Sequence, residues 1–474
     1  MAISPARAAA FDILLRVERQ DAYASELLHS SQYAKLSSAD HGLATELSMG
    51  VLRWRSLLDE EIERFSDKKG KKVDLEVLIA LRLAAYQLMF LDRIPGRAAV
   101  HESVELVKRA RKASAAPFVN AVLRKLSQSS PTYKTTGEGK ARNPDSSSAA
   151  STSSAEEVSR TWAHPGWLVE RWVHEFGLDT ARQICIYDQH PPQIAIRVPD
   201  SATAGELAKD GIKFAPGRLL TSARRVEEGN VSMTRAFAEG RVAIQDEASQ
   251  LVGLLTGRGS RILDCCAAPG GKTRVLAERN PQAGIVALEL HPHRARLLRQ
   301  LVPATNVEVI NSDVRDYTPS SHFDCVLVDV PCSGTGTLAH NPEIKWRLQA
   351  ENLADLHQRQ LEILRAAMKL VEPGGRLVYS TCSMEREEND QVAEEALAAE
   401  PLFEALDCRP ELEGLRTEGE LAGIEIDSLL RGRFVRTIPG VHPCDGFFAA
   451  ILKRKSGGTP AMVSGLQNSR PRQE

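Results

Sequence analysis

A regular alternation of short apolar segments and amphipathic helices runs through the second half of the chain. Five segments have the length and apolar content of buried strands: Arg261–Cys265, Gly284–Glu289, Val307–Ile310, Asp324–Asp329 and Arg376–Thr381. Helical stretches such as Lys272–Arg279 and Leu353–Leu370 separate several of them, and Phe447–Leu452 would add a late strand. This order predicts an α/β fold with a doubly wound, mostly parallel sheet over residues 246–455.

Residues 1–128 show a different periodicity, in which apolar side chains recur three and four residues apart. The pattern is clearest in four stretches: Ala8–Val17, Leu43–Leu52, Leu75–Leu91 and Val100–Ala110. Short breaks such as Ser37–Asp40 supply residues that can cap the next helix. We therefore predict an all-helical domain of four to six helices.

The remaining segments differ in their apolar content. Residues 129–160 are rich in Ser, Thr, Gly and Pro and predict a flexible linker. Residues 161–245 combine an amphipathic stretch with the strand-like Gln193–Val198 and predict a small α+β subdomain. The polar residues 456–474 predict a disordered tail. A chain of 474 residues is long enough for several such domains.

Several classes of protein are excluded by what the sequence lacks. No apolar run is long enough to cross a bilayer, and Asp12 interrupts the N-terminal apolar stretch without a cleavage site after it. We therefore expect a cytoplasmic protein without a membrane partner. The eight cysteines include no Cys-x-x-Cys pair and no histidine cluster with zinc spacing lies near them, so we expect free thiols and no metal.

Charge is distributed unevenly along the chain. The net charge is −2, but residues 1–130 carry 20 Lys and Arg against 16 Asp and Glu. Two basic runs, 68–72 and 108–112, lie in this half. Most such runs are solvated faces, but two of them in one basic domain are compatible with contacts to nucleic-acid phosphates.

The loop after the first predicted strand has the composition of a ligand-binding turn. It reads Asp264-Cys-Cys-Ala-Ala-Pro-Gly-Gly-Lys-Thr273, and its glycine pair lets the backbone approach a ligand at the start of the next helix. A triphosphate-binding loop would need glycine where Cys266 stands, so this loop does not predict one.

Carboxylates and thiols follow the other strand ends. Glu289 and Asp313 follow the second and third strands, and Asp329 ends the fourth. Cys332 follows the fourth strand and Cys382 the fifth. Ligands bind at the carboxyl ends of strands in such sheets, so these groups should share one rim. Two thiols beside a nucleoside-type site suggest covalent catalysis.

These segments together resemble a known family. DCCAAPGGKT, DVPCSGTG followed by HNPEIKW, and LVYSTCS are similar to motifs of the RNA cytosine-5 methyltransferases, which have a Rossmann-like catalytic domain. The N-terminal AFDILLRV and ELSMGVLRW resemble the NusB-type RNA-binding domain. The pairing is typical of the 16S ribosomal RNA enzymes of the Sun/Fmu type, and the resemblance covers nearly everything except the linker and tail.

The resemblance implies roles for individual residues. S-adenosylmethionine would be bound by the glycine-turn residues, namely Cys266, Ala267, Ala268, Pro269, Gly270, Gly271 and Lys272. Glu289 would hold the ribose, where the family usually has Asp, and Asp313 would lie beside the adenine with Arg294 supporting the pocket. Asp329 would lie between cofactor and base. Cys382 would be the nucleophile, and Cys332 would assist release of the product.

The implied activity is methylation of carbon 5 of a cytosine in small-subunit ribosomal RNA by a monomeric enzyme. Other readings remain open. Another RNA, such as tRNA, could be the substrate. A methyltransferase for an exocyclic amine or a ribose would not need the thiols, and a DNA cytosine-5 enzyme would lack the Thr-Cys thiol. A non-catalytic RNA-binding factor would leave the cofactor and thiol residues without a role.

Overall fold

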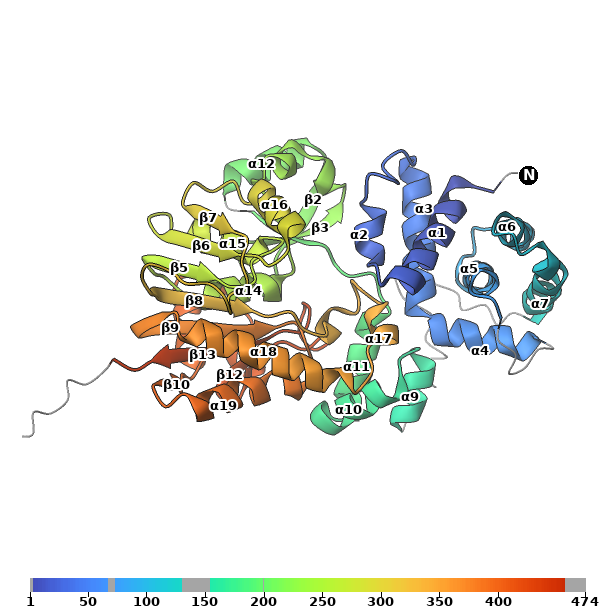
Figure 1. Cartoon of the computed structure of the whole chain (residues 1–474). Coiled ribbons are helices and arrows are strands. Elements are labelled where there is room, and N and C mark those ends of the chain that lie inside the picture. The colour runs from blue at the N-terminus through green and yellow to red at the C-terminus, as the bar shows by residue number, and fades with distance from the viewer. Residues whose placement is uncertain (1–2, 67–72, 130–153, 199, 457–474) are drawn as a thin grey trace, which may run out of the picture.

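Alanine and leucine side chains that recur at helical spacing form the N-terminal group of helices. In this computed structural model, which describes residues 3–66, 73–129, 154–198 and 200–456, a group of helices stands beside an α/β body (Figure 1). The N-terminal helices are α1 (Pro5–Gln20), α2 (Ala24–Leu28), α3 (Ser38–Arg53), α4 (Arg55–Phe65), α5 (Leu75–Phe90), α6 (Gly96–Arg109) and α7 (Ala116–Ser129). A 3-10 turn, Ala113–Ala115, precedes α7. These seven exceed the expected four to six, because α2, α4 and α7 were not among the predicted stretches.

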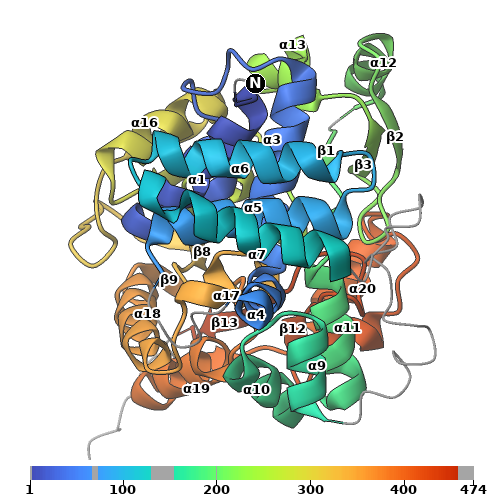
Figure 2. The same ribbon diagram turned by 90° about the vertical axis from the view of Figure 1, so that its right-hand side faces the viewer.

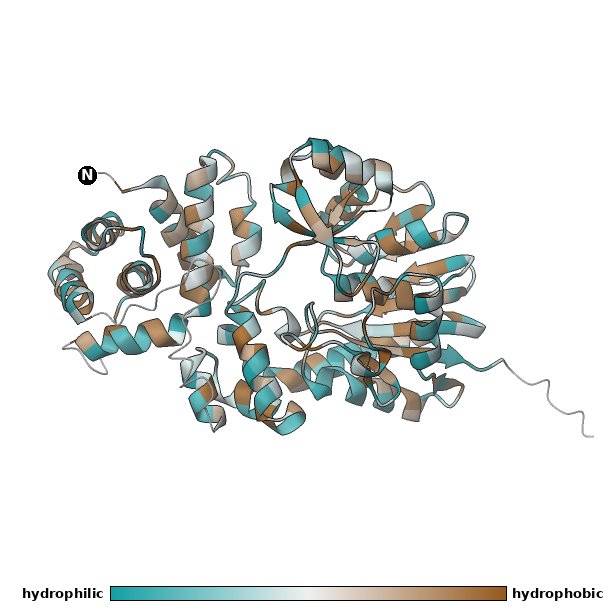
Figure 3. Cartoon of the chain, turned by 180° about the vertical axis from the view of Figure 1, so that it is seen from behind, coloured by the Kyte–Doolittle hydropathy of each residue, from teal (hydrophilic) through white to brown (hydrophobic). Residues whose placement is uncertain are grey.

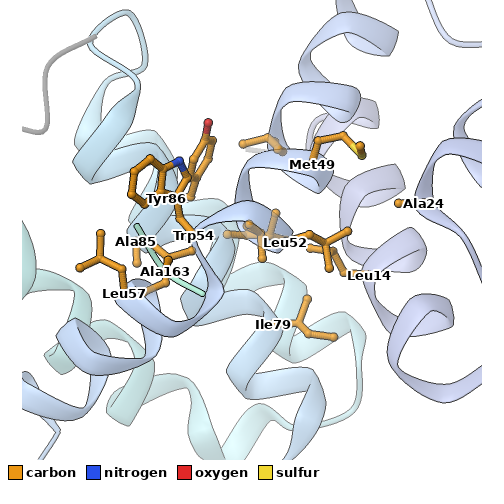
Figure 4. Close-up of a cluster of buried hydrophobic side chains, with 14 of the residues drawn as sticks. Leu14, Ala24, Met49, Leu52, Trp54, Leu57, Ile79, Ala85, Tyr86 and Ala163 are labelled. Atoms are coloured by element: carbon orange, nitrogen blue, oxygen red, sulfur yellow. The ribbon is translucent and has the colours of Figure 1, made fainter. Parts of the chain in front are cut away.

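The helical core is built around α5, which Figure 2 shows flanked by α6 and α7. Its side chains are buried on all sides, including Ile79 and Tyr86. Figure 4 shows these residues grouped with Leu14, Leu52 and Trp54 from other helices. Such an all-round apolar helix is stable only at the centre of a bundle.

Three further helices join this helical core. They are α9 (Ala155–Thr161), α10 (Gly166–Phe176) and α11 (Leu178–Asp188). Trp162 and Ala163 pack into the same apolar cluster as the N-terminal helices, with the rings of Trp54 and Trp162 centred 6.4 Å apart. These helices therefore pack with the N-terminal helices. Helix α9 begins at Ala155, within the segment for which a linker is predicted.

Some predictions concern residues outside the described ranges. The first basic run, 68–72, most of the predicted linker and nearly all of the predicted tail belong to this group. In the second basic run, Lys108 pairs with Glu105, Arg109 with Asp12, and Lys112 with Asp74. Three charges of this run therefore already have acidic partners.

A small antiparallel sheet precedes the main one. Its strands are β1 (Ala195–Arg197), β2 (Lys213–Pro216), β3 (Ala223–Glu228) and β4 (Ala243–Ile244), in the order β2-β3-β1-β4. Two helices, α12 (Ser201–Lys209) and α13 (Arg235–Ala238), and a 3-10 turn (Val231–Met233) accompany it. Its own small apolar core contains Ile196, Leu207 and Val226.

The main sheet confirms the predicted doubly wound α/β fold. Its order is β11-β12-β13-β9-β8-β5-β6-β7, with β10 paired to β13. The strands are β5 (Arg261–Asp264), β6 (Gly284–Leu288), β7 (Val307–Ile310), β8 (Phe323–Asp329), β9 (Val371–Thr381), β10 (Phe403–Ala405), β11 (Leu430–Arg431), β12 (Phe434–Arg436) and β13 (Phe448–Arg454). Strands β5 to β9 pair in parallel, and the late strand β13 pairs antiparallel with β9.

Helices cover both faces of this sheet (Figure 1). They are α14 (Glu247–Leu255), α15 (Gly271–Arg279), α16 (Pro292–Leu301), α18 (Asn352–Met368), α19 (Asp390–Ala399) and α20 (Arg409–Thr417). The short helix α17 (Ile344–Arg347) lies apart from them, and 3-10 turns stand at Thr335–Thr337, Arg386–Glu388 and Ile426–Leu429. In β8, Leu327 faces one apolar cluster and Val326 the other. A strand that is buried on both faces has a continuous run of apolar residues in its sequence. Figure 3 shows such apolar segments in brown on the strands of the main sheet.

The HNPEIKW segment joins the two halves of the molecule. The Glu343 carboxylate accepts a hydrogen bond from the Ala24 backbone N–H at 2.7 Å, and the Trp346 indole donates to the Leu52 carbonyl at 2.6 Å. The Lys345 ammonium donates to the Arg53 carbonyl at 3.0 Å. Figures 1 and 2 both show α17 at this junction beside α4. The segment that follows the Cys332 loop therefore anchors the helical half.

Candidate active site

The carboxyl ends of β5, β8 and β9 form one rim, as predicted for a parallel sheet. Asp264 ends β5, Asp329 ends β8, and Cys382 follows β9 directly. Residue Asp329 lies opposite Ser380 in the ladder between β8 and β9. The Ser380 hydroxyl donates a hydrogen bond to Asp329 Oδ1 at 2.7 Å. The register of these strands thus fixes the acid beside the second cysteine loop.

The two predicted active-site thiols lie in contact. The Sγ atoms of Cys332 and Cys382 are 3.2 Å apart. The loop of Cys332 turns back so that the Gly336 N–H donates to the Cys382 carbonyl at 2.8 Å. The pKa of Cys332 is raised well above its ordinary value, first by the hydrogen bond with Cys382, then by burial and by nearby negative groups that include Glu388 and Asp329. Cys332 therefore keeps its proton more readily than an exposed thiol does.

The glycine turn depends on the absence of a side chain at Gly270. Its φ angle is 114°, and a Cβ atom there would lie 2.5 Å from Val302 and 2.7 Å from Leu298. Gly270 also starts α15, so the turn directs the first backbone N–H groups of that helix toward the rim. The peptide between Ala268 and Pro269 is cis. Glycine at position 270 therefore lets the chain make this turn into α15.

Lys272 connects the glycine turn to the end of β8. Its ammonium lies 2.7 Å from Asp329 Oδ2 and donates to the Ser249 hydroxyl at 2.9 Å. The same nitrogen lies 4.8 Å from the centre of the Phe447 ring. Because this lysine is largely buried, its ion pair with Asp329 is shielded from water and constrains both side chains.

A cavity of about 220 Å³ lies beside this turn. One wall is the glycine turn from Cys266 to Lys272, with Asp264 and Asp329 on the same side. The other wall includes Gln245, which follows β4, and Ser249, which lies in α14. This second wall was not predicted from the sequence. The polar run QDEAS just before the sheet is the signal that could have found it.

Three predicted carboxylates, together with Asp264, act on the pKa of one thiol. The pKa of Cys266 is raised first by burial and then by Asp264, Asp329, Glu289 and Asp313, in that order. Glu289 and Asp313 do not line the cavity beside the turn. This cavity therefore accounts for only part of the predicted set of site residues.

The individual carboxylates differ in their surroundings. Asp264 is buried, and burial raises its pKa to about 7 although the Thr273 hydroxyl donates to it at 2.7 Å. The Glu289 carboxylate accepts a hydrogen bond from the His291 N–H at 2.8 Å. Arg315 pairs with Asp313 at 2.7 Å and lowers the pKa of that carboxyl.

Arg294 contacts the glycine turn. Its guanidinium donates a hydrogen bond to the Ala268 carbonyl at 3.1 Å and thereby stabilises the turn. Within the described ranges, no group of three His, Cys, Asp or Glu side chains could hold a metal ion. None of the helices in those ranges is long and apolar enough to cross a bilayer.

Comparison with known proteins identifies the family. A family model described as 16S rRNA methyltransferase RsmB/F matches residues 253–453, and a NusB family model matches residues 4–128. The probable ribosomal RNA small subunit methyltransferase B of Bacillus subtilis is 33% identical over 94% of this chain and 98% of its own length. The chain belongs to the 16S rRNA methyltransferase RsmB/F family. The resemblance inferred from its motifs is thereby confirmed.

A second curated relative and two solved structures are also similar to this chain. The ribosomal RNA small subunit methyltransferase B of Vibrio cholerae is 32% identical over 95% of this chain and 97% of its own length. The crystal structure of PH0851 matches with a TM-score of 0.75 and 24% identity over 96% of this chain and all of that one. A methyltransferase homolog from Pyrococcus horikoshii matches with a TM-score of 0.52 and 25% identity over 64% of this chain and 99% of its own. The first structure shares the architecture across both halves of the RsmB/F chain.

Proposed function

We propose that this RsmB/F protein transfers a methyl group from S-adenosylmethionine to carbon 5 of a cytosine in small-subunit ribosomal RNA, with Cys382 as nucleophile. The observation that carries the proposal is the contact between the Cys332 and Cys382 thiols at the rim, next to the Lys272–Asp329 ion pair. A methyltransferase for an amine or a ribose needs no such pair. The names of the curated relatives supply the expectation of a ribosomal substrate.

The residues around the glycine turn fit a nucleoside cofactor. Buried oxygen atoms of Asp264 and Gln245 lack hydrogen-bond partners, and both residues line the cavity. Gly270 leaves the backbone open where a side chain would fill space. The turn from Cys266 to Lys272 would hold the cofactor, with Glu289 and Asp313 on its ribose and adenine side. Bound S-adenosylmethionine supplies the methyl group.

The mechanism assigns separate tasks to the two thiols. The Cys382 thiolate adds to carbon 6 of cytosine, which raises electron density at carbon 5 and makes that carbon nucleophilic. Cys332, which keeps its proton, donates a hydrogen bond to the Cys382 thiolate before the addition. After methylation, the carbon-5 proton passes to water, and the electrons of the carbon–hydrogen bond restore the double bond between carbons 5 and 6. The bond between the Cys382 sulfur and carbon 6 breaks in the same step, and the Cys332 thiol donates a hydrogen bond to the departing Cys382 thiolate.

Asp329 and Lys272 contribute charge at the base. The Asp329 carboxylate, which pairs with Lys272, would stabilise the protonated ring nitrogen of an activated cytosine. The base must leave its stack to expose carbon 6, so single-stranded or loop RNA is favoured. We infer that the NusB-type helical half contributes to binding this RNA.

The test pairs the two cysteine variants. Wild type, Cys382→Ala and Cys332→Ala receive labelled S-adenosylmethionine and small-subunit ribosomal RNA, and denaturing gels report protein–RNA adducts. We expect loss of activity without an adduct in Cys382→Ala and a trapped adduct in Cys332→Ala. The reverse pattern would assign the nucleophile to Cys332, and full activity in both would refute covalent catalysis. tRNA serves as the competing RNA substrate.

A further inference from the structure

A buried carboxylate, Glu388, contacts both cysteine loops. It lies in the 3-10 turn Arg386–Glu388 and is fully buried. Its Oε1 atom accepts hydrogen bonds from the hydroxyls of Ser333 and Ser383, the latter at 2.6 Å. Its Oε2 atom accepts from the Ser333 backbone N–H at 2.8 Å and from the Gln360 amide at 2.8 Å. Four donors therefore converge on one side chain, which suits an ionised carboxylate.

No cation balances this charge in the described part of the chain. The neighbouring acids differ, because both Glu385 and Glu387 pair with Arg171. Glu388 takes part in none of the described ion pairs and is held by neutral donors alone. A buried carboxylate without a cation is costly, and a glutamine would pack in the same volume. A requirement for the charge at this position explains why a carboxylate stands there.

The donors identify what the carboxylate holds together. Ser333 follows Cys332, and Ser383 follows Cys382. The two serine hydroxyls lie 3.0 Å apart, and both donate to the same Oε1 atom. Gln360, on α18, also donates to the carbonyl just before Cys332, at 3.0 Å. Both cysteine loops are thus attached to one anchor beside the sulfur atoms.

We propose that Glu388 is a positioning residue for the thiol pair. By tying the residues after Cys332 and Cys382 together, it keeps the two Sγ atoms in hydrogen-bond contact. Its negative charge also favours the protonated form of Cys332, so the proton shared by the thiols stays on Cys332. This inference rests on the proposed covalent function and adds to it a residue that touches neither cofactor nor base.

The test compares Glu388→Gln with a matched control. Glutamine keeps the volume but removes the charge and one of the two accepting oxygens. Misplaced reacting groups cost about 100-fold in rate, so we expect kcat to fall about 100-fold. The KM for S-adenosylmethionine and the thermal stabilisation by S-adenosylhomocysteine should stay unchanged. Glu385→Gln, an equally buried change that contacts α10 instead, should keep kcat near that of wild type.

A purely structural role would give a different pattern. It would lower the melting temperature and weaken cofactor binding together with kcat, and that outcome overturns the proposal. Equal kcat values in Glu388→Gln and Glu385→Gln would also overturn it. If Glu388→Gln fails to fold, Ser383→Ala removes only one donor from the same anchor, and a fall in its kcat with unchanged cofactor KM carries the same meaning.

Adduct trapping separates this proposal from the proposed function. The Cys332→Ala variant is compared with the double variant Cys332→Ala/Glu388→Gln. No adduct in Cys332→Ala alone would refute the covalent mechanism, whatever Glu388 does. An adduct that forms equally fast in both would leave the covalent mechanism intact and overturn only the positioning role. We expect the adduct to form more slowly in the double variant, because Glu388 also holds Ser383, the residue after the remaining nucleophile Cys382.

Discussion

The sulfur atoms of Cys332 and Cys382 lie 3.2 Å apart although fifty residues separate them in the chain. Their contact follows from the topology, since β8 and β9 are parallel neighbours and each thiol stands just after its strand. Two thiols this close cannot both ionise easily, because the second negative charge would face the first. The pair therefore holds one proton more firmly than two separate thiols would.

This shared proton predicts unequal reactivity of the two cysteines toward iodoacetamide. The pKa of Cys332 is raised above its ordinary value of 9.0, with the Cys382 hydrogen bond as the largest cause and burial next. Cys332 should stay a thiol at near-neutral pH and react only as the pH rises well above that value. Mass spectrometry of alkylated peptides should show Cys382 modified first. Buried Cys444 is the unreactive reference, and modification of Cys332 as fast as Cys382 would contradict the assignment.

Removing the Lys272 ammonium should damage catalysis more than stability. Lys272→Met leaves the Asp329 carboxylate, 2.7 Å away, without its cation. Losing one partner of a largely desolvated charge pair costs about 2–3 kcal/mol, or roughly 30- to 150-fold in kcat/KM. Steady-state kinetics with S-adenosylmethionine measure this effect. The exposed Lys209→Met is the control, and equal kcat/KM in both variants would exclude Lys272 from the site.

Periodicity predicted the strands because it is a local property. In β8, alternate residues such as Val326 and Leu327 enter different apolar clusters, so the whole run reads as apolar. Strand β9 begins at Val371, five residues earlier than expected, because Gly374 and Gly375 resemble a turn. A Cβ atom at Gly375 would lie 3.0 Å from the Asp324 carbonyl, so the close approach to β8 accounts for this glycine inside a strand.

Packing partners could not be predicted in the same way. The periodicity of α10 shows that one face is buried, but not that Leu168 and Trp172 join the N-terminal helical core. The motifs predicted the rim residues because each of these residues stands at the end of a strand or in the loop just after it. Glu388 was not predicted because it reaches the site from a 3-10 turn whose own sequence carries no recognisable motif. The polar run that begins at Gln245 is visible in the sequence, but it does not show that this segment lies against the glycine turn. Their roles depend on tertiary contacts alone.

Asp264 should make stability depend on pH. Burial is the largest cause that raises its pKa to about 7 from an ordinary value of 3.8. The folded protein then binds a proton that the unfolded chain has lost, so stability falls as the pH rises between these two values. In Asp264→Asn this titration is absent, and the fall in melting temperature between about pH 5 and about pH 8 should be smaller.

The comparison with Asp264→Asn needs a matched variant, because Asp246 and Asp445 have raised pKa values in the same range. Their contribution remains in both proteins and cancels in the difference. Exposed Asp316→Asn should keep the pH dependence of wild type. A fall in melting temperature that is identical in Asp264→Asn and wild type would show that Asp264 is already ionised in the folded state.

Glu343 should couple the helical half to the catalytic half. Its carboxylate is buried and accepts the Ala24 N–H at the start of α2. Glu343→Ala would leave that N–H without a partner, at a cost of about 1–3 kcal/mol. Hydrogen exchange should therefore speed up in residues 24–28. Glu26→Ala, an exposed change on the same helix, should leave the exchange unchanged, and equal rates in both variants would argue against the coupling.

Gly336 should be the most restrictive small residue near the thiols. Its N–H donates to the Cys382 carbonyl, and its own carbonyl accepts the Gly446 N–H, each at 2.8 Å. A Cβ atom at this position would lie 2.2 Å from the Gly446 oxygen and 2.8 Å from the Cys382 oxygen. Both atoms belong to the backbone and cannot rotate away. The added methyl group in Gly336→Ala must therefore move the Cys332 loop away from the Cys382 loop.

The expected result for Gly336→Ala is a loss of unfolding free energy of about 1–3 kcal/mol, as for other overpacked sites. Adduct formation should fall as well, because the thiols separate. Gly414→Ala is the matched control, since it lies in α20 and no atom stands within 4 Å of its added Cβ. That variant should gain about 0.5–1 kcal/mol from the stiffer helix. Denaturant unfolding measures both changes. If Gly336→Ala proved as stable and active as Gly414→Ala, the contact between the two loops would not be what fixes the distance between the sulfur atoms.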